Sequence, residues 1–213
     1  LLLLVLYPRL KAIGEKSISS HKKHAVTDAP DQWGSFCRLG AVVFGRSIMY
    51  LGLNTFIVLY FMNHFHESQN FSNLLLSVYY GIGALFTLIG GKMGDKHGYR
   101  TFVRLGFLLA FPAALILAWT DSSILGILCL IILGAALNLT YSPMVVLGQQ
   151  YLPNRVGLAS GITLGLAVSV GGITAPLLGK VGDMYGLETT FYVIALITLI
   201  PLISSFTLPK PKK

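Results

Sequence analysis

Six apolar runs fill most of this 213-residue chain and restrict how it can fold. They cover approximately residues 35–62, 71–93, 99–119, 123–146, 156–181 and 189–208. A run of about 20 apolar residues crosses the hydrocarbon core of a bilayer as a helix, where every backbone polar group must be bonded internally. The sequence therefore predicts an all-α membrane protein with six transmembrane helices.

The composition agrees with a membrane protein and excludes an ordinary soluble domain. Charged residues make up 11% of the chain and hydrophobic residues 54%, whereas soluble domains carry about 25% charged residues. The net charge of +8 is unevenly placed, because basic residues gather at some connections and avoid others. That pattern is a membrane-topology signal and does not indicate nucleic-acid binding.

Charge and hydropathy divide the chain into four segments. Residues 1–7 are expected to be the end of a preceding transmembrane helix, and 8–34 a cytoplasmic central linker rich in lysine. Residues 35–208 form the six-helix unit, and 209–213 a basic cytoplasmic tail. With linker and tail inside, nearly all Lys and Arg residues of the short connections also fall inside, as the positive-inside rule requires. His64, His66, Asp121, Asp183 and Glu188 then lie outside.

A short glycine-rich phrase occurs twice and reveals an internal repeat. Gly91, Lys92, Gly94, Asp95 and Gly98 recur as Gly179, Lys180, Gly182, Asp183 and Gly186. The first copy also carries Lys96 and Arg100, where the second has Met184 and Glu188. The copies fall on opposite sides of the membrane, so helices one to three and four to six form a 3+3 inverted repeat. Such repeats are typical of secondary transporters.

The first copy resembles the loop signature of the major facilitator superfamily. In that family the signature lies in the cytoplasmic loop between the second and third helices of each six-helix half, which is its predicted place here. A narrower resemblance, to the fosmidomycin resistance protein group of drug exporters, is carried by residues 46–61 and 149–186. It implies the C-terminal half of a twelve-helix, proton-coupled exporter in a bacterial inner membrane. The N-terminal six-helix half, expected on the same polypeptide, would be its main partner.

Arg46 is the sharpest candidate for substrate binding. It lies about 15 Å into its helix, near the bilayer midplane, where an unpartnered charge costs from about 3 to over 10 kcal/mol. Tyr50 and Asn54 follow one and two turns later on the same face. A bidentate Arg suits a phosphonate or carboxylate. Polar groups of the fourth helix complete the expected substrate cavity: Asn138, Tyr141 and Ser142.

Two further sets of residues are expected to serve movement and packing. The resemblance implies that the glycine-rich turn acts as a conformational latch, with Gly91, Gly94, Asp95, Lys96, Gly98 and Arg100. Small residues of the fifth helix suit close helix packing, and Pro176 suits bending. These are Gly157, Gly161, Gly165, Gly171, Gly172 and Pro176. Gly171 and Pro176, together with Ala175 and Gly179, resemble the antiporter motif of the family, with alanine in place of one glycine.

Other functions find less support in the sequence. No catalytic set is readable, no cofactor motif is present, and neither histidine pair has the ligand count of a metal site, so no enzyme is expected. No acidic residue lies mid-helix, so we expect the proton-coupling acid in the missing half. Two alternatives remain open: a half-size carrier that acts as a homodimer, and a non-transporting membrane scaffold or receptor.

Overall fold

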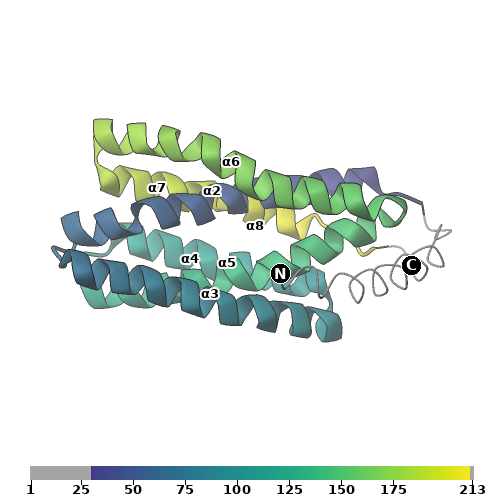
Figure 1. The fold of residues 1–213 in the computed structure, drawn as a ribbon, viewed down its shortest axis with the longest axis horizontal. Helices are drawn as coiled ribbons and strands as arrows, with labels where there is room; N and C mark the ends of the chain where they lie inside the picture. The colour runs from purple at the N-terminus through teal and green to yellow at the C-terminus, as the bar shows by residue number, and fades with distance from the viewer. Residues whose placement is uncertain (1–29, 212–213) are drawn as a thin grey trace, which may run out of the picture.

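The computed structural model describes residues 30–211, which form a bundle of long α-helices aligned along one axis (Figure 1). The elements are α2 (Trp33–Asn63), α3 (Gln69–His97), α4 (Tyr99–Trp119), α5 (Ser123–Tyr151), the short 3-10 helix η1 (Pro153–Arg155), α6 (Val156–Tyr185), α7 (Leu187–Ile197) and α8 (Leu199–Phe206). Six helical spans are long and apolar enough to cross a membrane. The expected helix end at 1–7, linker residues 8–29, Lys212 and Lys213 lie outside the described residues.

The helices extend beyond the apolar runs, and this corrects the expected turns. The apolar runs over 71–93 and 99–119 predict a turn over 94–98 between them, but α3 continues to His97 and only Gly98 departs from the helix. Likewise α6 continues to Tyr185 before the break at Gly186. The helices continue because their charged ends can leave the bilayer, where water solvates the side chains. A single glycine with positive φ then reverses the chain.

The last membrane span is divided at Thr198, which the apolar pattern does not show. Its backbone N–H is shared between the carbonyls of Ile194 and Ala195, at 3.2 Å each. Pro201 explains the break, because proline has no N–H and its ring clashes with the carbonyl four residues earlier. The span therefore consists of α7 and α8, joined by one residue.

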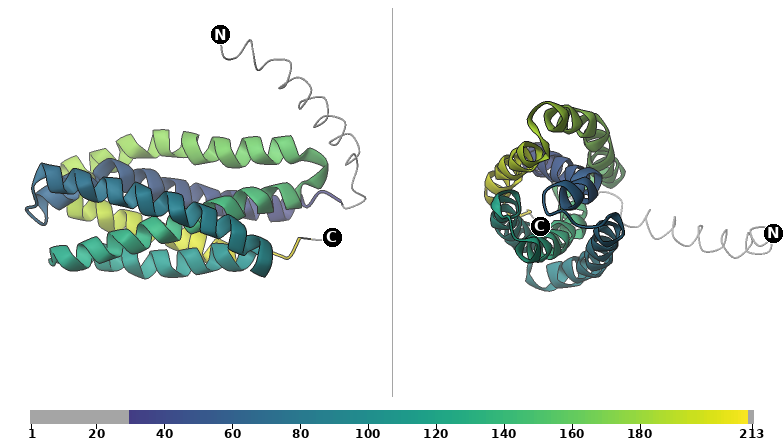
Figure 2. Two further views of the ribbon diagram at one scale, coloured as in Figure 1. Left: turned by 60° about the horizontal axis from the view of Figure 1, so that its bottom comes forward. Right: turned by 90° about the vertical axis from the view of Figure 1, so that its left-hand side faces the viewer.

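The inverted repeat is visible in the backbone. Gly98 ends α3 with φ 92° and ψ 128°, and its counterpart Gly186 ends α6 with φ 90° and ψ 156°. The first repeat is α2–α3–α4, and the second is α5–α6 followed by the divided span. In the end view, α6 lies at one edge of the bundle and α3 at another, with α2 between them (Figure 2).

Each end of the bundle is tied by long-range hydrogen bonds. At one end His64 bonds the Glu188 carboxylate at 2.9 Å and the Thr120 carbonyl at 3.0 Å, which joins the connection after α2 to the first turn of α7 and to the connection after α4. At the other end Arg104 donates to the carbonyls of Ser205 at 3.1 Å and Phe206 at 2.9 Å. These contacts place the connection after α2 and the chain after α8 at opposite ends.

The six spans are buried to very different degrees. In α3 and α6 only 22% of the spanning stretch is buried, against 39–61% in the other four. The core between the spans includes Tyr60 of α2 stacked on Phe191 of α7, with centroids 3.8 Å apart. Two helices thus present broad faces that no other described part of the chain covers.

Candidate functional site

Arg46 lies inside the bundle, with only 4% of its surface exposed. It stands on α2, and its Nε donates a hydrogen bond to the carbonyl of Leu137 on α5 at 3.0 Å. We find no hydrogen bond of its two terminal nitrogens within residues 30–211. The guanidinium is therefore positioned by one bond from its inner nitrogen, which leaves its fork available to another group.

Two aromatic rings hold the same guanidinium. Its central carbon lies 5.1 Å from the ring centroid of Tyr50, one turn along α2, and 4.9 Å from that of Tyr141 on α5. Both distances fall within the range of cation–π attraction. The ring of Tyr50 in turn lies 6.3 Å from that of Tyr79 on α3, so three helices converge on this charge.

The charge of Arg46 has no anionic partner in the described structure. The ion pairs found there are His64 with Asp121 and Glu188, and Arg155 with Asp31. A cation in a membrane interior is normally paired or faces a water-filled cavity. Carbonyl and aromatic contacts attract it without neutralising it, so the site retains a net positive charge.

A cavity of about 610 Å³ opens beside Arg46, a size in the usual range for small-molecule sites. Its walls come from α2, α3, α5 and α6 and combine one cation, polar groups and small apolar side chains. The lining residues are Arg46, Tyr50, Leu51, Thr87, Asn138, Tyr141, Ala167, Val168, Gly171, Gly172 and Ala175. An elongated anionic compound could place its charge on Arg46 and its carbon skeleton against α6.

The structure brings four of the six expected cavity residues together: Arg46, Tyr50, Asn138 and Tyr141. Asn54 lies away from the cavity, and its buried side-chain oxygen has no hydrogen-bond partner among the described residues. At 3.6 residues per turn, Asn54 is rotated by about 80° from Arg46. Ser142 faces α3, where its hydroxyl would lie 3.0 Å from a Cβ added at Gly91.

Sequence reasoning missed part of the cavity wall. Thr87 of α3 and Ala167 and Ala175 of α6 were not expected there, and Gly171 and Gly172 were expected only to pack or flex. The missed signal was the small residue at every turn of α6, namely Ala167, Gly171 and Ala175. Small side chains there leave space beside the bulky side chain of Arg46. Gly171 also packs closely on Leu51, because a Cβ there would overlap that side chain.

The three glycines in the first half of α6 are placed differently. A Cβ added at Gly157, Gly161 or Gly165 would meet no atom of the described chain within 4 Å. Their close packing with another helix is therefore not realised inside residues 30–211. The helix continues through Pro176 without a break, and the missing N–H of this proline leaves the Gly172 carbonyl without its usual helical donor.

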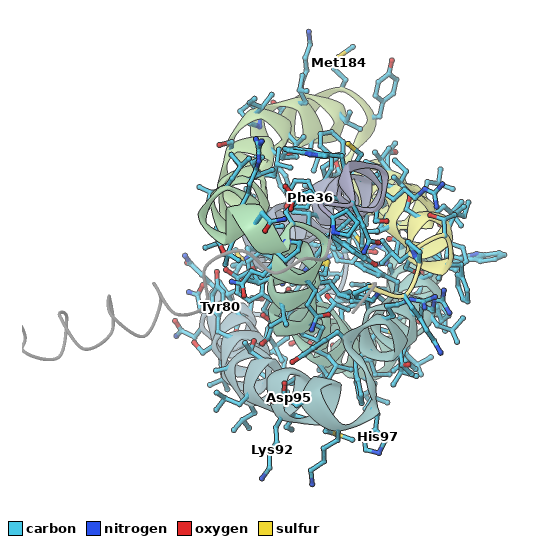
Figure 3. The ribbon with its side chains drawn as sticks, turned by 90° about the vertical axis from the view of Figure 1, so that its right-hand side faces the viewer. Phe36, Tyr80, Lys92, Asp95, His97 and Met184 are labelled. Carbon is cyan, nitrogen blue, oxygen red and sulfur yellow. The ribbon has the colours of Figure 1, made fainter. Side chains whose placement is uncertain are left out.

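The expected latch residues gather at the α3–α4 end. Asp95 accepts a hydrogen bond from the hydroxyl of Tyr99, and Lys96 is exposed. The Nε of Arg100 is buried without a hydrogen-bond partner. Figure 3 shows Asp95 and His97 on the last turns of α3. In this structure, none of the three charged latch residues is in an ion pair with another described residue.

Comparison with known sequences gives consistent matches. The family described as Major Facilitator Superfamily matches residues 39–213. The "Uncharacterized MFS-type transporter YfnC" of Bacillus subtilis (strain 168) is 34% identical over 163 residues, covering 76% of this chain and 39% of the relative. The "Fosmidomycin resistance protein" of Escherichia coli (strain K12) is 31% identical over 166 residues, covering 78% and 40%. The chain thus spans about 40% of the length of these relatives.

Solved structures share the architecture. A peptide transporter POT (E310Q mutant) in complex with alafosfalin superposes with a TM-score of 0.75 at 18% identity, covering 83% of this chain and 38% of that one. The transporter FucP in the outward conformation gives a TM-score of 0.74 at 17% identity, covering 83% and 42%. At these identities the likeness concerns the fold.

Proposed function

Because the chain belongs to the major facilitator superfamily, we propose that it forms the C-terminal half of a secondary transporter for a small anionic compound. The observation that carries this proposal is Arg46, a buried cation on a cavity wall without an anionic partner in the described structure. A phosphonate or carboxylate would accept hydrogen bonds from the free fork of the guanidinium and neutralise it. We therefore assign Arg46, Tyr50, Asn138 and Tyr141 to substrate binding, with Asn54 and Ser142 as supports outside the cavity.

A second six-helix half would complete the cavity. The low burial of α3 and α6 supports this, as does the match to about 40% of each relative. The open row of Gly157, Gly161 and Gly165 suits the close approach of another helix. We expect this half on the same polypeptide. A homodimer of six-helix units would cover the same faces, and chemical crosslinking distinguishes the two arrangements.

Alternating access would then move the halves around the bound anion. In our proposal Gly91, Gly94, Asp95, Lys96, Gly98 and Arg100 form a latch that contacts the other half in one conformation and releases it in the other. The unpaired charges at this end support that role, since they are available to a partner. Gly171, Gly172 and Pro176 would let α6 adjust beside the cavity.

The direction and the driving force form the finer part of the proposal. We propose proton-driven export at a bacterial inner membrane, supported by the 31% identity to a fosmidomycin resistance protein. No Asp or Glu lies mid-span in α2–α8, so we place the coupling acid in the other half. Acid-to-amide substitutions there should abolish proton-driven flux. Normal flux in every such variant would contradict this placement.

The central test measures flux through Arg46 variants of the whole protein. Inverted membrane vesicles energised by a proton gradient would be supplied with radiolabelled fosmidomycin, a phosphonate, and with a cationic dye. We expect Arg46→Ala to abolish phosphonate accumulation and Arg46→Lys to retain part of it. Lys180→Ala, a charge removal at an exposed site on α6, serves as the control. Wild-type phosphonate flux in Arg46→Ala would refute the binding role of Arg46. Transport of the cationic dye without transport of the phosphonate by the wild type would refute an anionic substrate.

A further inference from the structure

A second cavity, of about 770 Å³, lies at the end of the bundle that carries the α3–α4 turn. It shares no lining residue with the cavity beside Arg46. The last turn of α3, the first two turns of α4, the end of α5 and the chain after α8 form its walls. None of the residues expected to bind the transported substrate lies there, whereas four residues of the proposed latch do: Gly94, Asp95, Gly98 and Arg100.

Three cationic side chains line this second cavity: Arg100, Arg104 and Lys210. Arg100 and Arg104 stand one turn apart on α4, an arrangement in which like charges destabilise a helix. The cavity wall has one carboxylate, Asp95, which accepts a hydrogen bond from Tyr99. Within residues 30–211 none of these cations is in an ion pair, so the cavity carries an excess of positive charge.

The wall that carries Lys210 is held in place by three side chains. Arg104 binds the carbonyls at the end of α8, Arg38 donates to the Thr207 carbonyl at 3.2 Å, and the Tyr151 hydroxyl donates to the Pro209 carbonyl at 2.8 Å. The chain that leads to Lys210 is thus fixed to α2, α4 and α5. Lys210, an exposed residue, lines the cavity together with Arg100 and Arg104.

Arg100 supplies the observation that points to a ligand. Its Nε is buried and has no hydrogen-bond partner in the described structure. A buried donor without an acceptor is unfavourable, and more so when it is charged. Residues of the first turn of α4 line the same cavity, and a helix N-terminus favours negative charge. An acceptor with several charged oxygens would satisfy all of these groups.

We propose that this second cavity binds a phosphate group. The Arg100 guanidinium and the Lys210 ammonium match a tetrahedral oxyanion in charge and hydrogen-bonding capacity. Arg104, whose Nε and Nη2 bind backbone carbonyls, adds positive charge. Two sources share this chemistry: the headgroup of an anionic phospholipid, reached from the membrane face, and a soluble phosphate ester. The inference concerns binding at this end of the bundle and is independent of the transported substrate.

The test measures binding in two arms on the purified whole protein. In the first arm, native mass spectrometry counts phosphatidylglycerol and phosphatidylcholine adducts after extraction in a neutral detergent. In the second arm, inorganic phosphate is titrated against chloride at matched ionic strength while thermal unfolding is followed. Arg100→Gln/Lys210→Gln removes two cations from the cavity. Figure 3 shows Lys92 pointing away from the bundle, so Lys92→Gln removes a charge at the same end without touching the cavity.

We expect the double variant to weaken binding by about 10-fold or more for each lost charged contact, and Lys92→Gln to match the wild type. A selective loss of phosphatidylglycerol adducts identifies a lipid headgroup as the source. A loss of phosphate-dependent stabilisation without any lipid preference identifies a soluble ester. Equal binding by wild type and double variant in both arms overturns the proposal.

A conservative variant separates lost charge from lost folding. Arg100→Lys/Lys210→Arg keeps both charges, and we expect it to retain binding. If the glutamine double variant does not fold, Lys210→Gln alone replaces it, with about 10-fold weaker binding expected. Wild-type binding by this single variant, or a lysine–arginine exchange that folds yet binds as weakly as the glutamine variant, overturns the role of these charges.

Discussion

The guanidinium carbon of Arg46 on α2 lies 4.9 Å from the ring centroid of Tyr141 on α5. Arg46 belongs to the first half of the inverted repeat and Tyr141 to the second, so the contact joins the two repeats at the cavity. The Leu137 carbonyl that accepts a bond from Arg46 stands one turn before Tyr141 on the same helix. Together these two contacts orient the guanidinium of Arg46 in the cavity wall.

Replacing Tyr141 tests the aromatic contact separately from the hydroxyl. Cation–π contacts contribute about 0.5–2 kcal/mol, so Tyr141→Leu should weaken anionic-substrate binding by about 2- to 30-fold. Tyr141→Phe keeps the ring and should bind as the wild type does. Equilibrium binding of a labelled phosphonate to the purified whole protein measures both. A loss in Tyr141→Phe equal to that in Tyr141→Leu would show that the hydroxyl carries the interaction.

Gly98 and Gly186 should respond alike to substitution by alanine. Their φ angles of 92° and 90° lie where side chains are strained, yet a Cβ at either position would meet no atom within 4 Å. We expect each alanine variant to destabilise the fold by about 1–3 kcal/mol, through the backbone alone. Unfolding in mixed micelles with increasing denaturant measures the change. An unchanged midpoint in either variant would contradict the equivalence of the two turns.

Gly90 and Gly81 of α3 form a matched pair for testing helix packing. A Cβ at Gly90 would collide with the backbone carbonyl of Leu139 on α5, whereas one at Gly81 would meet nothing within 4 Å. Gly90→Ala should therefore force α3 and α5 apart and destabilise the fold by about 1–3 kcal/mol. Gly81→Ala should be neutral or slightly stabilising, because alanine favours helix. Equal stability of the two variants would refute the close contact.

Cysteine labelling tests the expected orientation. His66 and Lys96 are both exposed and lie near opposite ends of α3. In a background with Cys37→Ser and Cys129→Ala, a membrane-impermeant maleimide should label His66→Cys in intact cells. Lys96→Cys should react only after the membrane is permeabilised, because positive loops stay inside. The reverse pattern, or equal labelling of both in intact cells, would contradict the expected topology.

The spans could be predicted from the sequence, because a bilayer requires long apolar helices. The six-helix all-α fold and the family resemblance are confirmed. The turns were wrong in detail: hydropathy marks where the membrane ends, whereas a helix ends where its hydrogen bonds end, at Gly98 and Gly186. The division at Thr198 was missed, although Pro201 gave a local signal for it.

The site was less predictable from the sequence. Helical periodicity shows which residues share a face of one helix, but it does not show which neighbouring helix packs against that face. Arg46 and Tyr50 share a wall as expected, but the accumulated rotation carries Asn54 out of it. Ser142 is turned toward α3 by the packing of α5, which no single-helix pattern shows. The small residues of α6 form a cavity wall because α2 supplies the large side chains that line the same cavity, Arg46, Tyr50 and Leu51.

The lone positive charge of the cavity also acts at a distance. At an effective dielectric constant of about 20, a cation held about 10 Å from Arg46 is repelled by about 1.7 kcal/mol, and an anion is attracted equally. The local concentrations of anion and cation then differ by a factor of about 270 before either touches a side chain. In the transporter that we propose, the electrostatic field of the cavity would therefore select anions over cations, and the contacts inside would distinguish one anion from another.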